Sequence, residues 1–308
     1  MSRPRPDRAV PPSRGEGRDL ERLGTVAVVG VGLIGGSIGM ALRARGLARE
    51  VVGVGRDMAR LEEARGHGAI DRATVDMASG LAEADVVVVC TPVGRVAEDV
   101  RRASEIAPRS ALITDAGSTK RTIVEAVEKS PRAAEMFVAA HPMAGSEKTG
   151  AAHARADLYQ DRVCVLTPSP RTPRGLVGRA REFWSSLGCR TVEMGPAEHD
   201  EVVAFTSHLP HALAASLAGS VPADWHALAA GAFRDVTRVA GADTELWTAI
   251  FRENRGPLMN AIGKLQDRLS ALKYALMTDD EESIRRWWGD ARARRALFES
   301  RQPPAPHS

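Results

Sequence analysis

A run of closely spaced glycines at residues 30–35, Gly-Val-Gly-Leu-Ile-Gly, constrains the fold of this chain more than any other feature. It follows an apolar stretch of strand character at residues 25–29 and opens a helical pattern at residues 33–45. A β-rich run at residues 51–54 then completes strand, turn, helix and strand within about 30 residues, the length of one βαβ unit. The pattern predicts a parallel α/β sheet whose first turn binds a dinucleotide.

Each glycine has a separate task in this interpretation. Gly30 makes the tight turn, Gly32 lets the backbone approach a pyrophosphate, and Gly35 allows the helix to pack closely on the strand. The pyrophosphate is expected on the free N–H groups at the start of the helix, beside Leu33 and Ile34, where the helix dipole favours negative charge. We therefore predict that these five residues bind the cofactor.

The end of the second strand bears on the choice between NAD and NADP. An NAD site usually carries an acid there, roughly 20 residues past the glycines, but this chain has Gly55 at that position, followed by Arg56. The guanidinium of Arg56 can pair with a 2'-phosphate, which favours NADP. Asp57 is the counter-argument, because it could still reach a ribose, or it could cap the next helix. We expect NADP, with NAD as the alternative.

Length and composition exclude several classes of protein. A chain of 308 residues with 44% hydrophobic content can bury two modest cores, so two domains are expected. No run approaches about 18 consecutive apolar residues, so no membrane span is expected. The three cysteines lack CxxC spacing and suit a reducing cytoplasm better than a disulfide frame or a zinc site. Basic residues are diffuse and aromatic residues few, so nucleic acid is not an expected partner.

Strand-like and helical patterns alternate as far as residue 196, which predicts a doubly wound α/β (Rossmann) dinucleotide-binding domain over residues 23–196. Its further strands are expected at residues 85–91, 111–115, 137–141, 163–167 and 190–194. Ligands of such sheets bind outside the carboxyl ends of the strands, so Thr91, Ser118 and His141 are expected to converge on one crevice. Thr91 and Ser118 are predicted to contact the cofactor there.

The character of the sequence changes after residue 196, where strand-like runs disappear. Residues 198–220 are apolar nearly all round, and apolar residues from 258 to 276 alternate steps of four and three. We expect an all-α domain over residues 197–298 that binds substrate and forms a homodimer interface. Residues 1–22, rich in arginine and proline and without the apolar region of a secretory signal, and residues 299–308 are expected to be disordered tails.

Two side chains of the first half could carry the chemistry. His141 precedes Pro142, which restricts it to extended geometry. A histidine that titrates near neutral pH is a natural acceptor for the proton of a hydroxyl that loses hydride, although a structural role at a strand end is the alternative. Ser118 begins the helix after Asp115, so it is expected either to cap that helix or to face the nicotinamide.

The second half carries two histidines and two arginines at helical spacing. His208 and His211 have a spacing that could bind a metal, but no acid or cysteine completes a ligand set. We expect no metal and favour hydrogen-bonding histidines at the seam between the domains. Arg234 and Arg238 lie four residues apart, which suits the binding of a carboxylate, while a solvated basic face is the alternative.

Taken together, these motifs resemble those of the prephenate and arogenate (cyclohexadienyl) dehydrogenase family. The resemblance covers about residues 24–255. Its motifs are the glycine run at 30–36, DAGSTK at 115–120, HPMAG at 141–145, His199-Asp200, SHLPH at 207–211, FRDVTR at 233–238, ELW at 245–247 and Asn254. Several motifs in one order make this resemblance far more specific than the glycine run alone.

The resemblance implies NAD(P)-dependent oxidation of a cyclohexadienol in tyrosine biosynthesis, with loss of the ring carboxylate as CO2. It implies that His141 takes the proton of the ring hydroxyl and that Ser118 hydrogen-bonds the same hydroxyl and the cofactor. Arg238 and His211 are implied to contact the substrate, the arginine as a carboxylate anchor. The residues implied to line or gate the pocket are Ser146, Glu147, His208, Arg234 and Trp247.

Prephenate is the expected substrate, and arogenate is the alternative. The two differ in a keto group against an ammonium group, which Glu147 could favour, although Glu147 could equally pair with an arginine. A β-hydroxyacid dehydrogenase and a non-enzymatic dinucleotide sensor are the remaining hypotheses. Activity on simple hydroxyacids would favour the former, and cofactor binding without turnover the latter.

Overall fold

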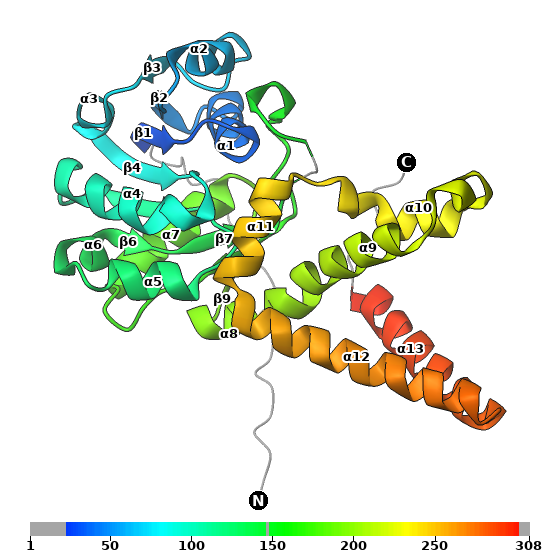
Figure 1. Ribbon diagram of the computed structural model, residues 1–308. Coiled ribbons are helices and arrows are strands. Elements are labelled where there is room, and N and C mark those ends of the chain that lie inside the picture. The colour runs from blue at the N-terminus through cyan, green and yellow to red at the C-terminus, as the bar shows by residue number, and fades with distance from the viewer. Residues whose placement is uncertain (1–22, 146–147, 302–308) are drawn as a thin grey trace, which may run out of the picture.

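The computed structural model describes residues 23–145 and 148–301 of the chain. An α/β part forms the first half, and a helical part projects from it in two arms (Figure 1). One arm is built from α9 (Leu209–Ser220) and α10 (Gly231–Thr237), and the other from α12 (Arg255–Met277) and α13 (Glu281–Arg301). The expected order, a dinucleotide-type α/β fold followed by helices, is confirmed.

A six-stranded parallel sheet forms the centre of the α/β part, with strand order β3-β2-β1-β4-β5-β6. The strands are β1 (Leu23–Val29), β2 (Ala48–Val54), β3 (Arg72–Thr74), β4 (Ala84–Val89), β5 (Leu112–Asp115) and β6 (Phe137–Val138). The helices between them are α1 (Leu33–Ala44), α2 (Met58–Gly66), α3 (Met77–Leu81), α4 (Val93–Ile106), α5 (Arg121–Val127) and α6 (Pro131–Met136). Strand order reverses between β1 and β4, which is where such sheets bind their ligands.

Both faces of this sheet are covered, which explains its continuous valine runs. In β1, Val26 and Val28 belong to one apolar cluster, whereas Ala27 and Val29 belong to the other. The first cluster includes side chains of α1, and the second includes side chains of α4 and α5. Successive residues of a strand point to opposite faces, so a strand that is buried on both sides needs apolar residues at every position.

The strand expected at residues 137–141 is split between two sheets, so the prediction that His141 stands at the carboxyl end of a parallel strand was wrong. β6 ends at Val138, and β7 (Ala140–Pro142) pairs antiparallel with β8 (Val163–Leu166), placing His141 opposite Val165. Side chains replace the main sheet's ladder at this point. Ala140 donates its N–H to Asp115 at 2.9 Å, and Lys120 donates to the Ala140 carbonyl at 2.8 Å.

The other two predicted strands exist but belong to this second sheet, whose order is β7-β8-β9. β8 runs parallel to β9 (Arg190–Glu193), and α7 (Arg174–Ser186) connects them. A short helix, η1 (Ala151–His153), lies against α1. Trp184 of α7 is fully buried and donates its indole N–H to Thr114 of β5 at 3.2 Å, which ties α7 to the main sheet.

The helix expected over residues 198–220 is interrupted. α8 (Pro196–Val203) passes into one π-helical segment, η2 (Ala204–His208), before α9 (Leu209–Ser220) continues. Pro210 explains the break, because proline has no N–H for the α-helical ladder and its ring crowds the carbonyl four residues earlier. The remaining elements are η3 (Ala223–Leu228), α10 (Gly231–Thr237), η4 (Arg238–Gly241), α11 (Thr244–Glu253), α12 (Arg255–Met277) and α13 (Glu281–Arg301).

The two arms expose large apolar side chains in the single chain. Leu213 on α9 is 41% exposed, and Leu276 at the end of the predicted α12 stripe is 61% exposed, whereas Leu258 at its start is buried. α13 continues to Arg301, so residues 299–301, expected in a tail, are helical. The tail predicted at residues 1–22 and the remainder of the other at 302–308 lie outside the described residues. Within the described ranges, no helix combines the length and apolar character needed to cross a membrane.

Candidate active site

The glycine turn has the geometry that a pyrophosphate requires. Gly30 has φ +94°, and a Cβ there would lie 2.8 Å from the Cys90 carbonyl oxygen. A Cβ on Gly35 would lie 2.2 Å from the Gly30 oxygen, whereas one on Gly32 would meet no atom within 4 Å. The start of α1 at Leu33 has no side-chain cap. The turn is therefore tight where the helix must pack, open where a phosphate must approach, and lined by N–H groups, so these residues fit a dinucleotide.

The residues after β2 bear on the cofactor's ribose. A Cβ on Gly55 would lie 3.2 Å from Leu61, so an acid at this position would require Leu61 to move. The Asp57 carboxylate caps α2 by accepting two backbone N–H groups of its first turn, at 2.9 and 3.3 Å. Arg56 is exposed, and among the described residues no hydrogen bond or ion pair engages it. The structure thus assigns the carboxylate to the helix and leaves the guanidinium accessible.

The loops after β1, β4 and β5 meet at one edge of the main sheet. Val29 pairs with Val89, and Val89 pairs with Asp115, so the residues that follow each strand emerge at the same level. Thr91 lies in the second loop, where its hydroxyl donates to Asp99 at 2.7 Å, and Ser118 lies half-buried in the third. Thr91 and Ser118 therefore follow strands that end at the same edge as the glycine turn.

Ser118 does not cap the helix that follows it, so that sequence-based alternative was wrong. α5 begins at Arg121, and its first turn is capped from another part of the chain by Asp200. The two carboxylate oxygens of Asp200 accept the N–H groups of Lys120 at 2.8 Å and of Arg121 at 3.0 Å. The hydroxyl of Ser118 is thereby left for another partner.

A buried ion pair lies beneath the loop that carries Ser118. Lys120 and Asp115 are both 0% exposed and are paired through Nζ and Oδ2. Asp115 also accepts the N–H groups of Gly117 and Ala140, at 2.9 Å each. Lys120 also donates to the Ala140 carbonyl. This cluster joins the end of β5 to β7, and so fixes the backbone that precedes His141.

His141 is the first member of a chain of three buried side chains. Its Nδ1 lies 2.8 Å from Nε2 of His199, and Nδ1 of His199 lies 2.8 Å from Oδ1 of Asp200. His199 and Asp200 lie on α8, whereas His141 lies on β7, so the chain crosses from the second sheet to the helical part. The two imidazole rings meet edge to face. His141 is thus held through one ring nitrogen.

A series of contacts in the helical part starts at Asp200 and runs through Asn254, His208, Trp247 and His211. The side-chain amide of Asn254 lies 2.9 Å from Nδ1 of His208 and donates to the Asp200 carbonyl at 2.8 Å. His208 meets the ring of Trp247 edge to face, and His211 stacks on Trp247 with ring centroids 3.6 Å apart. The predicted spacing of the two histidines thus serves hydrogen bonding and stacking around one tryptophan.

Burial keeps these histidines neutral. It holds the pKa of His141 well below its ordinary value, and the neighbouring His199, Lys120 and His208 act in the same direction. Burial lowers the pKa of His208 to about 4 and also lowers the pKa of His199, although the hydrogen bond to Asp200 opposes the second shift. A neutral imidazole at position 141 can accept a proton at neutral pH.

Arg238 supplies positive charge to the same group of residues. Burial lowers the pKa of His211, and the charge of Arg238 contributes to that shift. The η4 segment packs against α9, the helix that carries His211. Arg238 lies in η4, directly after α10. The arrangement therefore combines a dinucleotide turn, a buried neutral imidazole and a cation.

Comparison with known proteins agrees with this arrangement. Residues 38–193 match the family described as "Prephenate dehydrogenase, nucleotide-binding domain", and residues 195–290 match "Prephenate dehydrogenase, dimerization domain". The chain belongs to the prephenate dehydrogenase family. It is therefore an oxidoreductase with a nucleotide-binding domain of a family that acts in tyrosine biosynthesis.

Three relatives illustrate the match. The prephenate dehydrogenase of Bacillus subtilis is 30% identical over 91% of this chain and 78% of its own length. The structure of prephenate dehydrogenase from A. aeolicus in complex with hydroxyphenyl propionate and NAD+ is 29% identical, with a TM-score of 0.84 over 91% of this chain and 100% of that one. Synechocystis arogenate dehydrogenase is 28% identical, with a TM-score of 0.76 over 89% and 99% of the two chains.

Within this member of the prephenate dehydrogenase family, some predicted site residues are not brought to the centre. Arg234 lies exposed on α10, and no described contact ties it to Trp247 or His211. Ser146 and Glu147 lie outside the described residues. Conversely, sequence reasoning from residue patterns gave no role to His199, Asp200 or Lys120, which lie around His141. The signal that could have identified them is the dipeptide His199-Asp200 at the start of a helix, where two polar side chains need buried partners.

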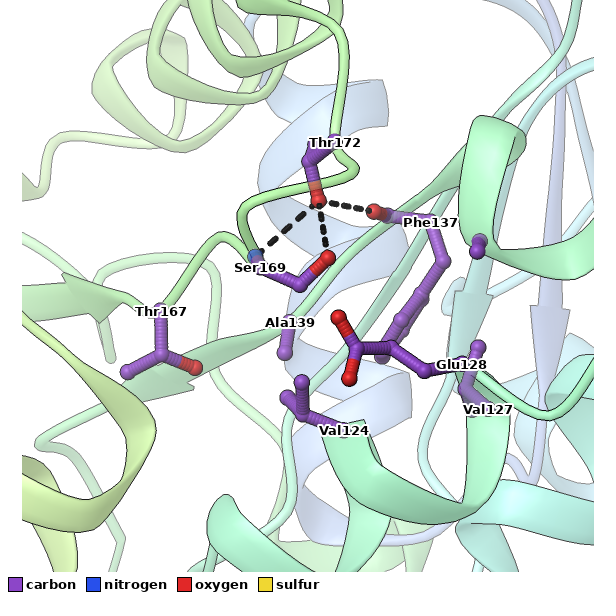
Figure 2. Close-up of a pocket in the computed structure, with 9 residues that line it drawn as sticks. Val124, Val127, Glu128, Phe137, Ala139, Thr167, Ser169 and Thr172 are labelled. Carbon is purple, nitrogen blue, oxygen red and sulfur yellow. Dashed lines mark hydrogen bonds between the residues drawn. The ribbon is translucent and has the colours of Figure 1, made fainter. Parts of the chain in front are cut away.

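A small hollow near β6 is separate from the residues described above. Figure 2 shows it between α5, α6 and the loop after β8, where Thr172 approaches Ser169 and the Phe137 carbonyl. Its volume of about 10 Å³ is the space of roughly one water molecule. The Oγ1 atom of Thr167 is buried there and has no hydrogen-bond partner among the described residues, so water fits the hollow and a cyclohexadienol does not.

Proposed function

We propose that this protein is a prephenate dehydrogenase that converts prephenate to 4-hydroxyphenylpyruvate and CO2 with NAD(P). The observation that carries the proposal is His141, buried and neutral, between the edge that holds the glycine turn and the helices that hold His211 and Arg238. A base beside a cofactor and a cation suits the oxidation of an anionic alcohol.

The residues divide the reaction among them. His141 accepts the proton of the ring hydroxyl, and Ser118 hydrogen-bonds the same hydroxyl. The glycine turn at residues 30–35 would hold the nicotinamide cofactor, which would supply the acceptor for the hydride that leaves C4 of the ring. The bond to the ring carboxylate then breaks, its electron pair passes through the ring to the C4 oxygen, and CO2 departs as the ring becomes aromatic. His141 returns the proton to that oxygen, which gives the phenol. Arg238 and His211 bind the substrate, and the proposed lining of the pocket comprises His208, Trp247, Arg234, Ser146 and Glu147.

Spectrophotometry tests this proposal directly. Purified protein is mixed with prephenate and either NADP or NAD, and the near-ultraviolet absorbance of the reduced nicotinamide is followed together with CO2 release. Reduction and CO2 in equal amounts are expected. Cofactor binding without turnover of prephenate or arogenate would contradict the proposal and favour a dinucleotide sensor.

Replacing Arg238 by alanine is expected to raise KM for prephenate about 10-fold or more and to change kcat less, because a charge-assisted hydrogen bond to a carboxylate contributes about 1.5–3 kcal/mol. Steady-state kinetics at saturating cofactor measures both constants. Arg102→Ala, which removes an exposed arginine from α4, is the matched control. An unchanged KM in Arg238→Ala would exclude its role as a carboxylate anchor.

Arogenate is the second candidate substrate, and the likeness to Synechocystis arogenate dehydrogenase supports testing it. The two substrates differ at the side chain, where an ammonium replaces a keto group. A nearby carboxylate would favour the ammonium, and Glu147 is the residue that we propose for that contact. Comparing kcat/KM for the two compounds decides between them. Glu147→Gln is expected to lower kcat/KM for arogenate alone.

We propose NADP as the preferred cofactor, on the basis of Gly55 and the accessible Arg56, with Asp57 engaged in capping α2. The NAD+ bound to the A. aeolicus relative supports the alternative. Arg56→Ala is expected to raise KM for NADP about 10-fold and to leave KM for NAD within about 2-fold, because only NADP carries the 2'-phosphate. Arg109→Ala, at the opposite edge of the sheet, is the control. Equal changes for both cofactors would remove Arg56 from 2'-phosphate binding.

We also propose a homodimer formed by the helical domain, with the division between the domains at residues 196 and 197. The exposed apolar side chains of the two arms, such as Leu213 and Leu276, support this assembly. The match to the family's dimerization domain supports it as well. Light scattering that gives the mass of one chain at micromolar concentration would contradict it.

A further inference from the structure

We propose that Asp200 and His199 are positioning residues that select the tautomer of His141, so that its outward nitrogen is free to take a proton. The inference rests on the proposed function in one respect, the role of His141 as the base. It concerns atoms that no substrate needs to touch. The order of donors and acceptors along the three buried side chains supports it.

The positions of the hydrogens along the three side chains can be assigned by starting from Asp200. The carboxylate of Asp200 can only accept, so Nδ1 of His199, 2.8 Å from Oδ1, carries the hydrogen and donates it. In a neutral imidazole the other nitrogen is then an acceptor, so Nε2 of His199 accepts from Nδ1 of His141 at 2.8 Å. The Nε2 atom of His141 is left with a lone pair. This is the tautomer that a general base requires, and it is the one that free imidazole in water disfavours.

The carboxylate itself is held firmly. Its oxygens also accept the N–H groups of Lys120 and Arg121, so Asp200 serves as the N-cap of α5 and the anchor of His199 at once. The Asn254 amide holds the Asp200 backbone through its carbonyl. Because the carboxylate's partners are two backbone N–H groups at the start of α5 and the ring of His199 on α8, rotation of this carboxylate would break several hydrogen bonds together.

The charged groups around His141, His199 and Asp200 act on the protonation state of the two rings, which must both be neutral. Those that face His141 are His199 on α8, His208 at the end of η2, and Lys120 before α5. Those that face His199 are Asp200, Lys120 and Asp115. Burial favours the neutral form of both rings. The carboxylate of Asp200 opposes this effect, but only at His199. If His199 gained a proton, it would donate to His141, and the Nε2 atom of His141 would have to carry a hydrogen. Protonation in acid is therefore expected to inactivate His141 and His199 together.

The first test reads the tautomers without any turnover. Full-length protein with isotope-labelled histidine, alone and with NADP, is studied by NMR of the ring nitrogens at neutral pH. The signals are assigned by their loss in His141→Asn and His199→Gln. We expect the hydrogen on Nδ1 in both rings. A hydrogen on Nε2 of His141 would overturn the proposal, whether or not the protein oxidises prephenate, so this result is independent of the proposed function.

The second test separates positioning from folding. His199→Gln keeps an oxygen that can accept from Nδ1 of His141, whereas His199→Leu has no acceptor. We expect the glutamine variant to retain kcat within about 3-fold and the leucine variant to lose about 10-fold or more, with KM for prephenate little changed in both. Equal losses in the two variants would show that His199 only fills space and would overturn the proposal.

The third test removes the anchoring carboxylate. Asp200→Asn is expected to lower the plateau of kcat about 10-fold or more and to move the acid limb of kcat/KM to lower pH, because the carboxylate raises the pKa of His199. Asp76→Asn, which alters the same kind of helix cap on α3 far from any imidazole, is the control. A fall in thermal stability with an unmoved acid limb would reduce Asp200 to a helix cap and overturn its positioning role.

Discussion

His141→Asn is expected to lower kcat by a factor of about 10² or more, because general base catalysis contributes roughly 10²–10⁴-fold. Asparagine can still hydrogen-bond His199, but it has no lone pair that can accept a proton at neutral pH. The pKa of His141 is held well below the ordinary value of a histidine. The wild-type enzyme is therefore expected to stay active at pH values below that ordinary pKa, and only further acidification should protonate the base. The measurement is kcat and kcat/KM for prephenate across the acid range.

The matched control for this loss is His67→Asn, which makes the same change at an exposed histidine at the end of α2. It is expected to keep kcat within about 2-fold. Cofactor binding, followed by protein fluorescence, should be equal in wild type and His141→Asn, because the glycine turn lies on other strands. Turnover near the wild-type rate in His141→Asn would remove this histidine from the mechanism.

Lys120→Met is expected to lower the free energy of unfolding by about 3–5 kcal/mol, because it leaves the Asp115 carboxylate buried without its counter-charge. Both side chains are 0% exposed, so water cannot replace the ammonium. The Ala140 carbonyl loses its donor as well, next to His141. Denaturant unfolding at one fixed protein concentration measures the loss, since an oligomer's stability depends on that concentration.

Lys129→Met is the control, because Lys129 is exposed just after α5 and the chemical change is the same. It is expected to alter the free energy of unfolding by no more than about 0.5 kcal/mol. The charge at position 120 is thus separated from the general effect of losing a lysine. A Lys120→Met protein as stable as the control would mean that Asp115 is satisfied by the two backbone N–H groups alone.

The part of the site that sequence reasoning predicted follows from local rules. Gly30, Gly32 and Gly35 are predictable because a tight turn, an approaching phosphate and a close helix each exclude a side chain within a few residues. The valine run of β4 is predictable because a strand covered on both faces is apolar at each position. The interruption before α9 follows the same kind of rule, since Pro210 stands in the sequence, but the periodic apolar pattern concealed it.

The errors share a different cause. Ser118 was a reasonable cap by spacing, but α5 takes its cap from Asp200, 80 residues beyond Lys120. The strand at residues 137–141 reads as one apolar run, but the side chains of Asp115 and Lys120 take over the hydrogen bonds of Ala140, and the chain changes sheets. A hydrogen bond between distant residues leaves no periodic trace, because the partner's position along the chain is unconstrained by local geometry.

By itself, then, the sequence determined the α/β fold, the dinucleotide turn, the helical second half and the choice of His141 as a candidate base. Each of these depends on residue spacing that a single strand or helix imposes. Only the tertiary structure decided which partner holds the second nitrogen of His141, and therefore which of its nitrogens can act. His199 and Asp200 reach that ring because α8 packs against α5, and burial makes their hydrogen bonds obligatory.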